Sequence, residues 1–143
     1  MIGKKLMLDK AFLDTNILIY AYSEDEPKKQ SIALQLLDSF EDHVIISKQV
    51  INELSNILLK KFKLGSDQVE NVLLEIDNVL PIVDFDLTTQ IKALKLKDRY
   101  QFQFYDALIV ATALENNCTV VYSEDMQHKM LIDGSLKIIN PFN

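Results

Sequence analysis

The chain has 143 residues, of which 48% are hydrophobic and 25% charged, with a formal net charge of −6 at pH 7. These proportions are typical of a globular protein, and the length predicts one domain spanning residues 1–143. No apolar run approaches the ~20 residues of a membrane-spanning helix, and the first ten residues lack the apolar stretch of a signal peptide. We therefore expect a cytoplasmic protein without membrane attachment.

Cysteine and histidine are scarce, which narrows the chemistry. Cys118 is the only cysteine, and His43 and His128 are the only histidines. An internal disulfide and a thiolate metal site are excluded, and a zinc site of several imidazoles is disfavoured. We interpret Cys118 as a small buried hydrophobe. The negative net charge argues against tight non-specific nucleic-acid binding by the metal-free protein, because such binding leaves a basic footprint.

The first half of the chain alternates short apolar runs with segments of helical periodicity. In chain order we expect a strand at 11–13, helices at 16–22 and 28–40, a strand at 43–46, a helix capped by Ser47, and a helix that opens at Ser66 or Asp67 after Gly65.

The second half continues the alternation. Pro81 makes 79–83 an edge strand or the start of a strand. A helix is expected at 87–97 with Ile91, Ala93 and Leu94 inward, a buried helix at 106–116 that is apolar nearly all round, and strands at 119–122 and 136–139. Strands that alternate with helices predict an α/β fold with a mostly parallel central sheet covered on both faces.

Four acidic residues lie at positions where a carboxylate is costly to bury without a positive partner: Asp14, Glu53, Asp106 and Asp125. Each has a structural alternative. Asp14 is a good helix N-cap, Asp125 suits a turn, Glu53 on the apolar face of its helix can extend to solvent, and Asp106 can cap the helix it opens. Ligands gather beyond the carboxyl ends of parallel strands, and the occurrence of all four acids favours one shared site there.

Carboxylate clusters of this kind suit Mg²⁺ or Mn²⁺, which prefer oxygen ligands. Such ions activate water and stabilise the leaving oxygen in phosphodiester hydrolysis, without a histidine or a covalent nucleophile. The residues therefore indicate a metal-dependent enzyme that acts on phosphate esters.

The motifs resemble those of the PIN-domain nucleases, and most closely the VapC-type toxins of prokaryotic toxin–antitoxin pairs. The similar stretches follow the family's order along almost the whole chain: 12–21, 47–53, 105–113, 122–127 and 138–142. The resemblance implies a three-layer α/β/α fold and a Mg²⁺- or Mn²⁺-dependent endoribonuclease that cuts structured RNA such as tRNA or rRNA. It also implies a homodimer and a small antitoxin that occupies the active-site groove.

By the same resemblance, Asp14, Glu53, Asp106 and Asp125 match the acidic catalytic and metal-binding positions. Thr15, Asn16 and Ser123 match polar positions that orient carboxylates or water. Two points depart from the pattern or leave it open: Lys129 stands where similar sequences often have Gly, and Glu124 is an adjacent acid with the potential to replace Asp125. We prefer Asp125, from the Ser-x-Asp spacing.

Other features leave alternatives open. Lysines at 60, 61 and 63, and basic residues at 92, 95, 97 and 99, are candidate RNA contacts, although solvated helix faces explain them as well. Phe102, Phe104 and Tyr105 are more consistent with core packing than with base stacking. Besides the nuclease, we consider a non-catalytic PIN-like protein-interaction module and an aspartate-based phosphotransfer domain; the latter lacks the second Asp of an Asp-x-Asp pair after Asp14.

Overall fold

The computed structural model describes residues 10–40 and 43–143. Within these ranges the strands are β1 (Ala11–Leu13), β2 (Val44–Ser47), β3 (Ile82–Val83), β4 (Val120–Tyr122), β5 (Leu131–Ile132) and β6 (Leu136–Ile139). The helices are α2 (Thr15–Tyr22), α3 (Pro27–Phe40), α4 (Lys48–Lys60), α5 (Ser66–Val79), α6 (Leu87–Tyr100) and α7 (Phe104–Glu115).

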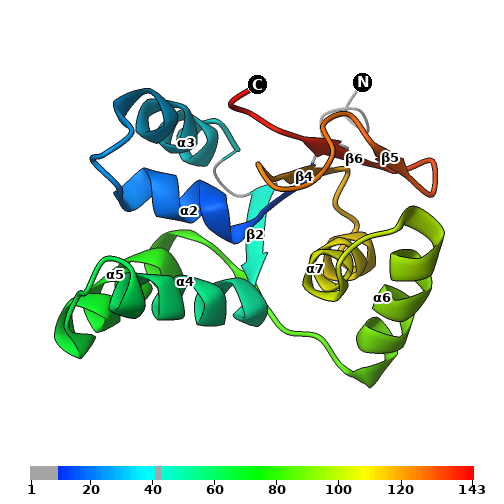
Figure 1. The fold of residues 1–143 in the computed structure, drawn as a ribbon, viewed down its shortest axis with the longest axis horizontal. Helices are drawn as coiled ribbons and strands as arrows, with labels where there is room; N and C mark the ends of the chain where they lie inside the picture. Colours follow the sequence, from blue (N-terminus) through cyan, green and yellow to red (C-terminus); the bar gives the residue numbers. More distant parts are fainter. Residues whose placement is uncertain (1–9, 41–42) are drawn as a thin grey trace, which may run out of the picture.

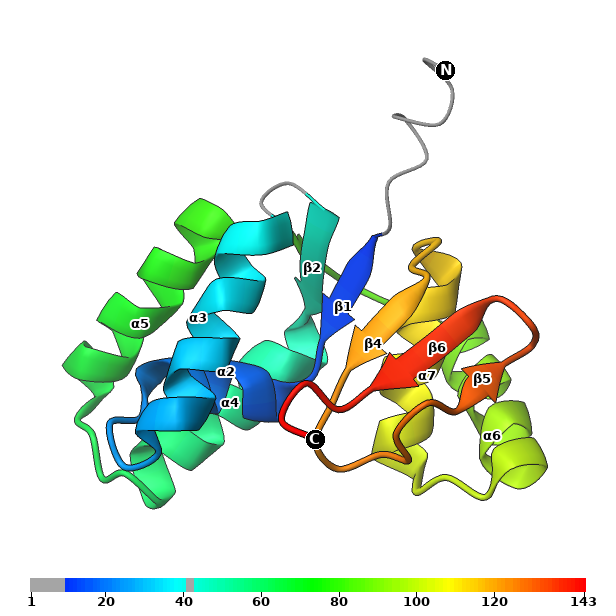
Figure 2. The ribbon, with the colours of Figure 1, turned by 90° about the horizontal axis from the view of Figure 1, so that it is seen from above.

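The strands form one sheet in the order β3-β2-β1-β4-β6-β5. All neighbours are parallel except β5 and β6, which are antiparallel. Figure 2 shows β1 between β2 and β4. The strand order reverses beside β1, so the carboxyl ends of β1 and β4 border a crevice of the kind in which α/β proteins bind ligands.

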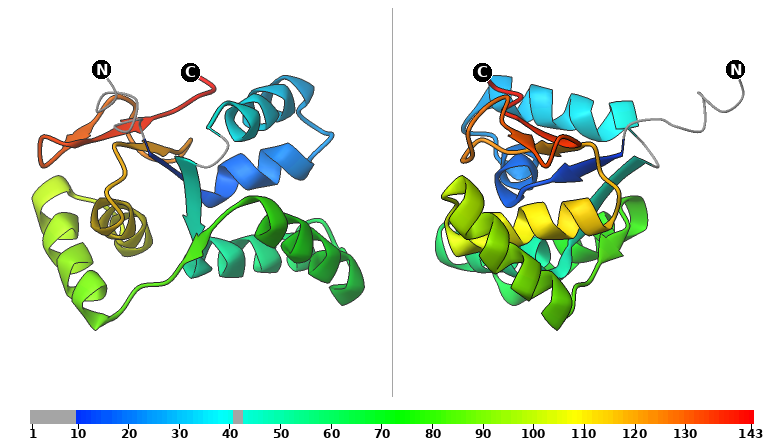
Figure 3. Two further views of the ribbon diagram at one scale, coloured as in Figure 1. Left: turned by 180° about the vertical axis from the view of Figure 1, so that it is seen from behind. Right: turned by 90° about the vertical axis from the view of Figure 1, so that its right-hand side faces the viewer.

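Helices cover both faces of the sheet, which gives the predicted α/β/α fold. Helix α6 packs against α7, α2 against α3, and α4 against α5 (Figure 1). The right-hand view of Figure 3 shows α3 and the α6–α7 pair on opposite sides of the strands. Because β1 and β2 are covered on both sides, their residues are buried without interruption, as parallel strands require.

The buried core confirms the prediction made for α7. Every residue from Ala107 to Ala113 on that helix is buried. Cys118 is buried as well, and burial raises the pKa of its thiol to about 11, so the thiol is inert near neutral pH.

Several expectations for α6 and its surroundings were wrong. Ala93 is buried, but Ile91 and Leu94 are 47% and 51% exposed. The buried residues of the helix are Thr89, Ala93 and Leu96, so a different stripe from the predicted one faces inward. Tyr105 is also exposed rather than packed in the core. Phe102 and Phe104 are partly buried and pack against the core, as expected.

Element boundaries differ in smaller ways. His43 and Thr119 lie just before their strands, Val79 ends α5 instead of opening a strand, and the two-residue strand β5 was not predicted. Pro81 directly precedes the edge strand β3, which agrees with its interpretation as the start of a strand. No helix in the described part of the chain has the length and apolar character needed to cross a membrane.

Candidate active site

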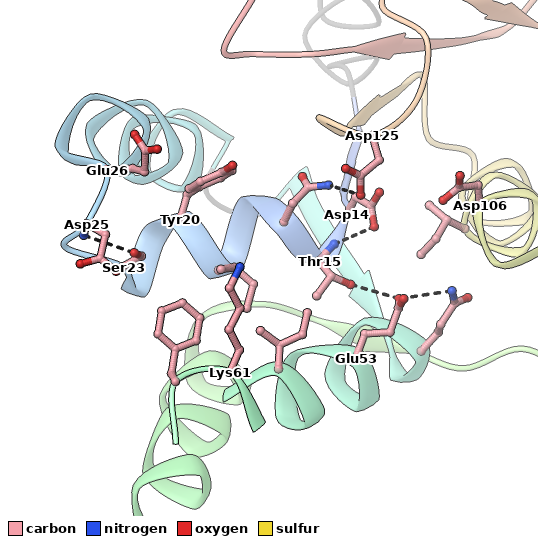
Figure 4. Close-up of a pocket in the computed structure, with 16 residues that line it drawn as sticks. Asp14, Thr15, Tyr20, Ser23, Asp25, Glu26, Glu53, Lys61, Asp106 and Asp125 are labelled. Carbon is pink, nitrogen blue, oxygen red and sulfur yellow. Dashed lines mark hydrogen bonds between the residues drawn. The ribbon is translucent and has the colours of Figure 1, made fainter. Parts of the chain in front are cut away.

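A pocket of about 480 Å³ opens beyond the carboxyl ends of β1 and β4, and all four predicted acids line it. They come from four separate parts of the chain: Asp14 follows β1, Glu53 lies on α4, Asp106 lies in the first turn of α7, and Asp125 lies in the loop after β4. Figure 4 shows these side chains facing one another across the pocket.

Asp14 is held at the base of the pocket. It is the N-cap of α2, so its structural interpretation and its place in the site are compatible: Oδ1 accepts a hydrogen bond of 2.7 Å from the backbone N–H of Thr15. Its other oxygen, Oδ2, accepts one of 2.7 Å from the hydroxyl of Ser123. Both oxygens therefore have donors, although the side chain is buried.

Ser123 connects Asp14 to Asp125, and Asn16 holds the Asp125 carboxylate. The Ser123 oxygen accepts a hydrogen bond of 3.2 Å from the backbone N–H of Asp125. The Asn16 amide donates to Oδ2 of Asp125 at 3.0 Å. The polar residues singled out in the sequence thus lie where they orient the carboxylates.

Glu53 is fixed by two donors. Its Oε1 accepts hydrogen bonds from the Thr15 hydroxyl at 3.1 Å and from the Gln49 amide at 3.3 Å. Gln49 also donates to the carbonyl of Tyr105, at 3.1 Å, and so ties α4 to the start of α7. The structural alternative requires Glu53 to extend to solvent or to pair with a basic residue. Its carboxylate instead faces the pocket and is bonded to the neutral donors Thr15 and Gln49.

Asp106 differs from the other three acids. The N-cap of α7 is Gln103, so Asp106 does not cap the helix. Burial, followed by the charges of Asp125 and Glu53, raises the pKa of Asp106. Its position in the first turn places its charge near the positive end of the helix dipole, which offsets part of this cost.

The electrostatics of the pocket are unfavourable to its own carboxylates. Burial raises the pKa of Asp14 to about 7; hydrogen bonds from Ser123 and the Thr15 backbone oppose the rise, and the charges of Asp106 and Glu53 add to it. Among the described lining residues only Lys61 is basic. The site therefore holds more negative charge than its own donors neutralise.

This donor set fits a hard divalent cation in its chemistry, since every candidate ligand is a carboxylate oxygen. Within the described residues, however, no three His, Cys, Asp or Glu side chains are arranged closely enough to hold a metal ion as they stand. The hydrogen bonds explain the spacing, because Asp14, Glu53 and Asp125 each turn toward a neutral donor. A cation that drew them together would also offset the burial and the mutual repulsion that raise the pKa values of Asp14 and Asp106.

The structure separates Asp125 from Glu124. Glu124 does not line the pocket, and its carboxylate is bonded to Tyr20 and Lys29. Lys129 does not line it either. Lys129 adopts a φ of 69°, a left-handed conformation that glycine adopts more readily, and so it keeps the turn that a glycine would form.

Gln49 is the site residue that sequence reasoning missed. It is 7% exposed, and its Oε1 has no hydrogen-bond partner among the described residues. The available signal was its spacing, since residues i and i+4 share a helix face and Gln49 lies four residues before Glu53. Of the three lysines proposed as RNA contacts at and after the end of α4, Lys61 lines the pocket, whereas Lys60 and Lys63 do not.

Comparison with known proteins identifies the family of the chain. The family model for the PIN domain matches residues 11–131. The chain therefore belongs to the PIN domain family, which confirms the resemblance seen in its motifs. A comparison with curated protein sequences found no significant match.

Solved structures share the fold. A toxin–antitoxin complex from Klebsiella pneumoniae matches with a TM-score of 0.72 and 22% identity, covering 92% of this chain and 98% of that one. VapC20 from Mycobacterium tuberculosis, a toxin that cleaves the sarcin–ricin loop, matches with a TM-score of 0.67 and 18% identity. The match covers 81% of this chain and 90% of that one. VapBC2 from Rickettsia felis, bound to a DNA fragment from its promoter, matches with a TM-score of 0.65 and 22% identity. The match covers 90% of this chain and 96% of that one.

Proposed function

We propose that the chain is a metal-dependent endoribonuclease, a single domain that hydrolyses phosphodiester bonds in structured RNA and serves as the toxin of a toxin–antitoxin pair. The observation that carries the proposal is the convergence of Asp14, Glu53, Asp106 and Asp125 on one pocket. Membership of the PIN domain family supports nuclease chemistry, and the structural likeness to toxins supports the biological role.

In this proposal the four acids are the ligands of Mg²⁺ or Mn²⁺, and their neighbours orient them. Ser123 directs Asp14, Asn16 directs Asp125, and Thr15 with Gln49 directs Glu53. Asp106 has no hydrogen-bond donor among the described residues, so a cation would supply the positive partner that it lacks. When bound, the metal supplies an activated water and stabilises charge on the phosphate and the leaving oxygen.

The side chains at the edge of the acidic cluster have a separate task in RNA binding. Lys61 lies on the same pocket as the four acids and supplies positive charge for a phosphate of the RNA. With a net charge of −6, the metal-free protein repels a polyanion, so we expect RNA binding to depend on metal loading.

The proposed partners follow from the same comparison. The matching Klebsiella pneumoniae structure is a toxin–antitoxin complex, and a homodimer bound to a small antitoxin is the assembly we propose here. The antitoxin would cover the acidic pocket, and the reaction would take place in the cytoplasm, where cellular RNA is found.

Cleavage of total cellular RNA by the purified protein tests the function. We expect discrete fragments with Mg²⁺ or Mn²⁺, none with EDTA, and a loss of at least 100-fold in Asp106→Asn. Asp77→Asn is the matched control, since Asp77 is exposed on α5 and lies outside the pocket. Equal cleavage by the Asp106→Asn variant and the wild type would refute the proposal. A folded, metal-loaded wild type without activity would favour the protein-interaction module.

A further inference from the structure

We propose that Lys29, Tyr20 and Glu124 form a clamp that positions Asp125 for metal binding. The inference rests on the proposed function and adds three positioning residues to the site. Tyr20 and Glu124 lie within stretches that resemble the family motifs, but the resemblance assigns neither a positioning role, and Lys29 lies outside those stretches. Lys29 and Glu124 do not line the pocket.

The contacts within the clamp converge on the carboxylate of Glu124. Its Oε1 accepts a hydrogen bond of 2.6 Å from the Tyr20 hydroxyl, and its Oε2 pairs with the Lys29 ammonium at 2.5 Å. Lys29 also donates to the Tyr20 hydroxyl at 3.2 Å, which closes a three-membered network. Both carboxylate oxygens of Glu124 are thereby engaged.

Aromatic rings hold Lys29 in place. Its ammonium nitrogen lies 4.8 Å from the centroid of the Tyr20 ring and 5.6 Å from that of Phe142, within the range of a cation–π contact. The two rings meet edge to face, with centroids 4.9 Å apart. The side chains of Lys29 and Glu124 are 32% and 26% exposed, so the pair is less screened by solvent than the Lys48–Asp84 pair, at 64% and 59%.

The clamp reaches Asp125 through one residue. The backbone N–H of Glu124 donates to Oδ1 of Asn16 at 3.2 Å, and the amide of Asn16 donates to Oδ2 of Asp125 at 3.0 Å. Tyr20 and Asn16 both lie on α2, so the side chain and the backbone of Glu124 are anchored to the same helix. Holding Glu124 at both points fixes the orientation of the next residue, Asp125.

Asp125 needs such support more than the other acids. It is the exposed member of the set and lies in a loop, whereas Glu53 and Asp106 are carried by helices and Asp14 is buried at the end of a strand. Residues that orient metal ligands from outside the coordination sphere typically change affinity by 10- to 100-fold. Since the clamp acts one step further out, we expect a smaller effect, about 3- to 10-fold.

Opposite electrostatic effects make the test decisive. Removing the positive charge in Lys29→Met would tighten Mn²⁺ binding if only long-range charge mattered, and removing the negative charge in Glu124→Gln would weaken it. Positioning predicts that both variants weaken Mn²⁺ binding, by about 3- to 10-fold. Lys29→Arg keeps the ion pair and should bind Mn²⁺ within about twofold of wild type. Lys48→Met breaks the exposed Lys48–Asp84 pair and serves as the control for loss of a lysine.

Calorimetric titration of each purified full-length variant with Mn²⁺ gives the affinities. Unchanged or tighter binding by Lys29→Met overturns the clamp, and weaker binding by both Lys29→Met and Glu124→Gln supports it. Amide hydrogen exchange of Glu124 and Asp125, measured by NMR without metal, adds a readout independent of the metal site. Faster exchange in Lys29→Met supports positioning, and unchanged exchange overturns it, even if wild type binds no Mn²⁺ and the proposed function itself fails.

Discussion

Replacing Asp14 by Asn should stabilise the metal-free protein at pH 8 although it destroys the proposed metal site. The pKa of Asp14 is raised from 3.8 to about 7, chiefly by burial. At 1.36 kcal/mol per pKa unit, holding this carboxylate ionised costs about 4 kcal/mol. The Asn side chain keeps the bond from the Thr15 N–H but loses the charge-assisted bond from Ser123, so we expect about half of this, ~2 kcal/mol, as a gain.

The sign of the pH dependence follows from proton binding. Between about pH 4 and pH 7 the folded protein holds a proton on Asp14 that the unfolded chain has released, so the free energy of unfolding of wild type falls as pH rises. Asp14→Asn lacks this loss. The variant lacks the Ser123 bond at every pH, so it should be less stable than wild type by ~2 kcal/mol at pH 4, gain steadily up to about pH 7 and keep a constant advantage above it.

Thermal unfolding in EDTA measures the effect. A gain of ~2 kcal/mol corresponds to a rise in Tm of about 4–8 °C at pH 8 for a chain of this size. Adding Mg²⁺ should raise the Tm of wild type and leave that of the variant unchanged. Asp86→Asn is the matched control, since Asp86 is an N-cap on α6 outside the acidic pocket and Asn caps as well as Asp. An Asp14→Asn variant less stable than wild type at pH 8 would refute the reasoning, because Asp14 would then be only a helix cap.

Three further predictions follow from the same structure. The affinity for Mn²⁺, measured by calorimetry, should fall by up to about tenfold per pH unit below pH 7, because protons compete for Asp14, and should level off above it; a flat profile from pH 5.5 to 8 would exclude Asp14 as a ligand. Gln49→Met should weaken Mn²⁺ binding about tenfold by freeing Glu53, whereas Asn52→Ala, exposed on the same helix, should not. Phe12→Ala should lower the free energy of unfolding in urea by about 3–5 kcal/mol, since Phe12 is fully buried in β1, and a loss below 1 kcal/mol would contradict this packing.

Much of the fold was accessible from the sequence because parallel strands and buried helices leave strong local patterns. The uninterrupted apolar run of α7 marked it as buried, and Ser47 marked the start of α4, whose first turn it caps by accepting from Val50 N–H. β5 left no comparable signal, because two residues are too short for a period to show. Its pairing with β6 depends on the turn between them.

The errors on α6 have a physical cause. Leu87, Ile91 and Leu94 follow helical spacing, but so do Thr89, Ala93 and Leu96, and periodicity alone does not decide which stripe faces inward. The three-dimensional packing places the second stripe inward. Burial is a one-way rule in any case, because large apolar residues also occur on surfaces.

The sequence predicted the four acids of the site but not every contact that holds them. The four acids were conspicuous because each adjoins apolar residues, and the strand order determined that they meet. The role of Gln49 and the engagement of Glu124 by Lys29 depend on side-chain contacts across 56 and 95 positions of the chain. No local pattern carries such contacts, so they emerged only from the three-dimensional arrangement.

The most direct test of the account is anomalous diffraction from a crystal of the wild-type protein soaked in Mn²⁺. We predict a peak within ligand distance, about 2.0–2.3 Å, of carboxylate oxygens from at least two of Asp14, Glu53, Asp106 and Asp125. A fully loaded crystal with Mn²⁺ bound only elsewhere, or with these four carboxylates still bonded solely to their neutral donors, would contradict the proposed metal site and the nuclease mechanism built on it.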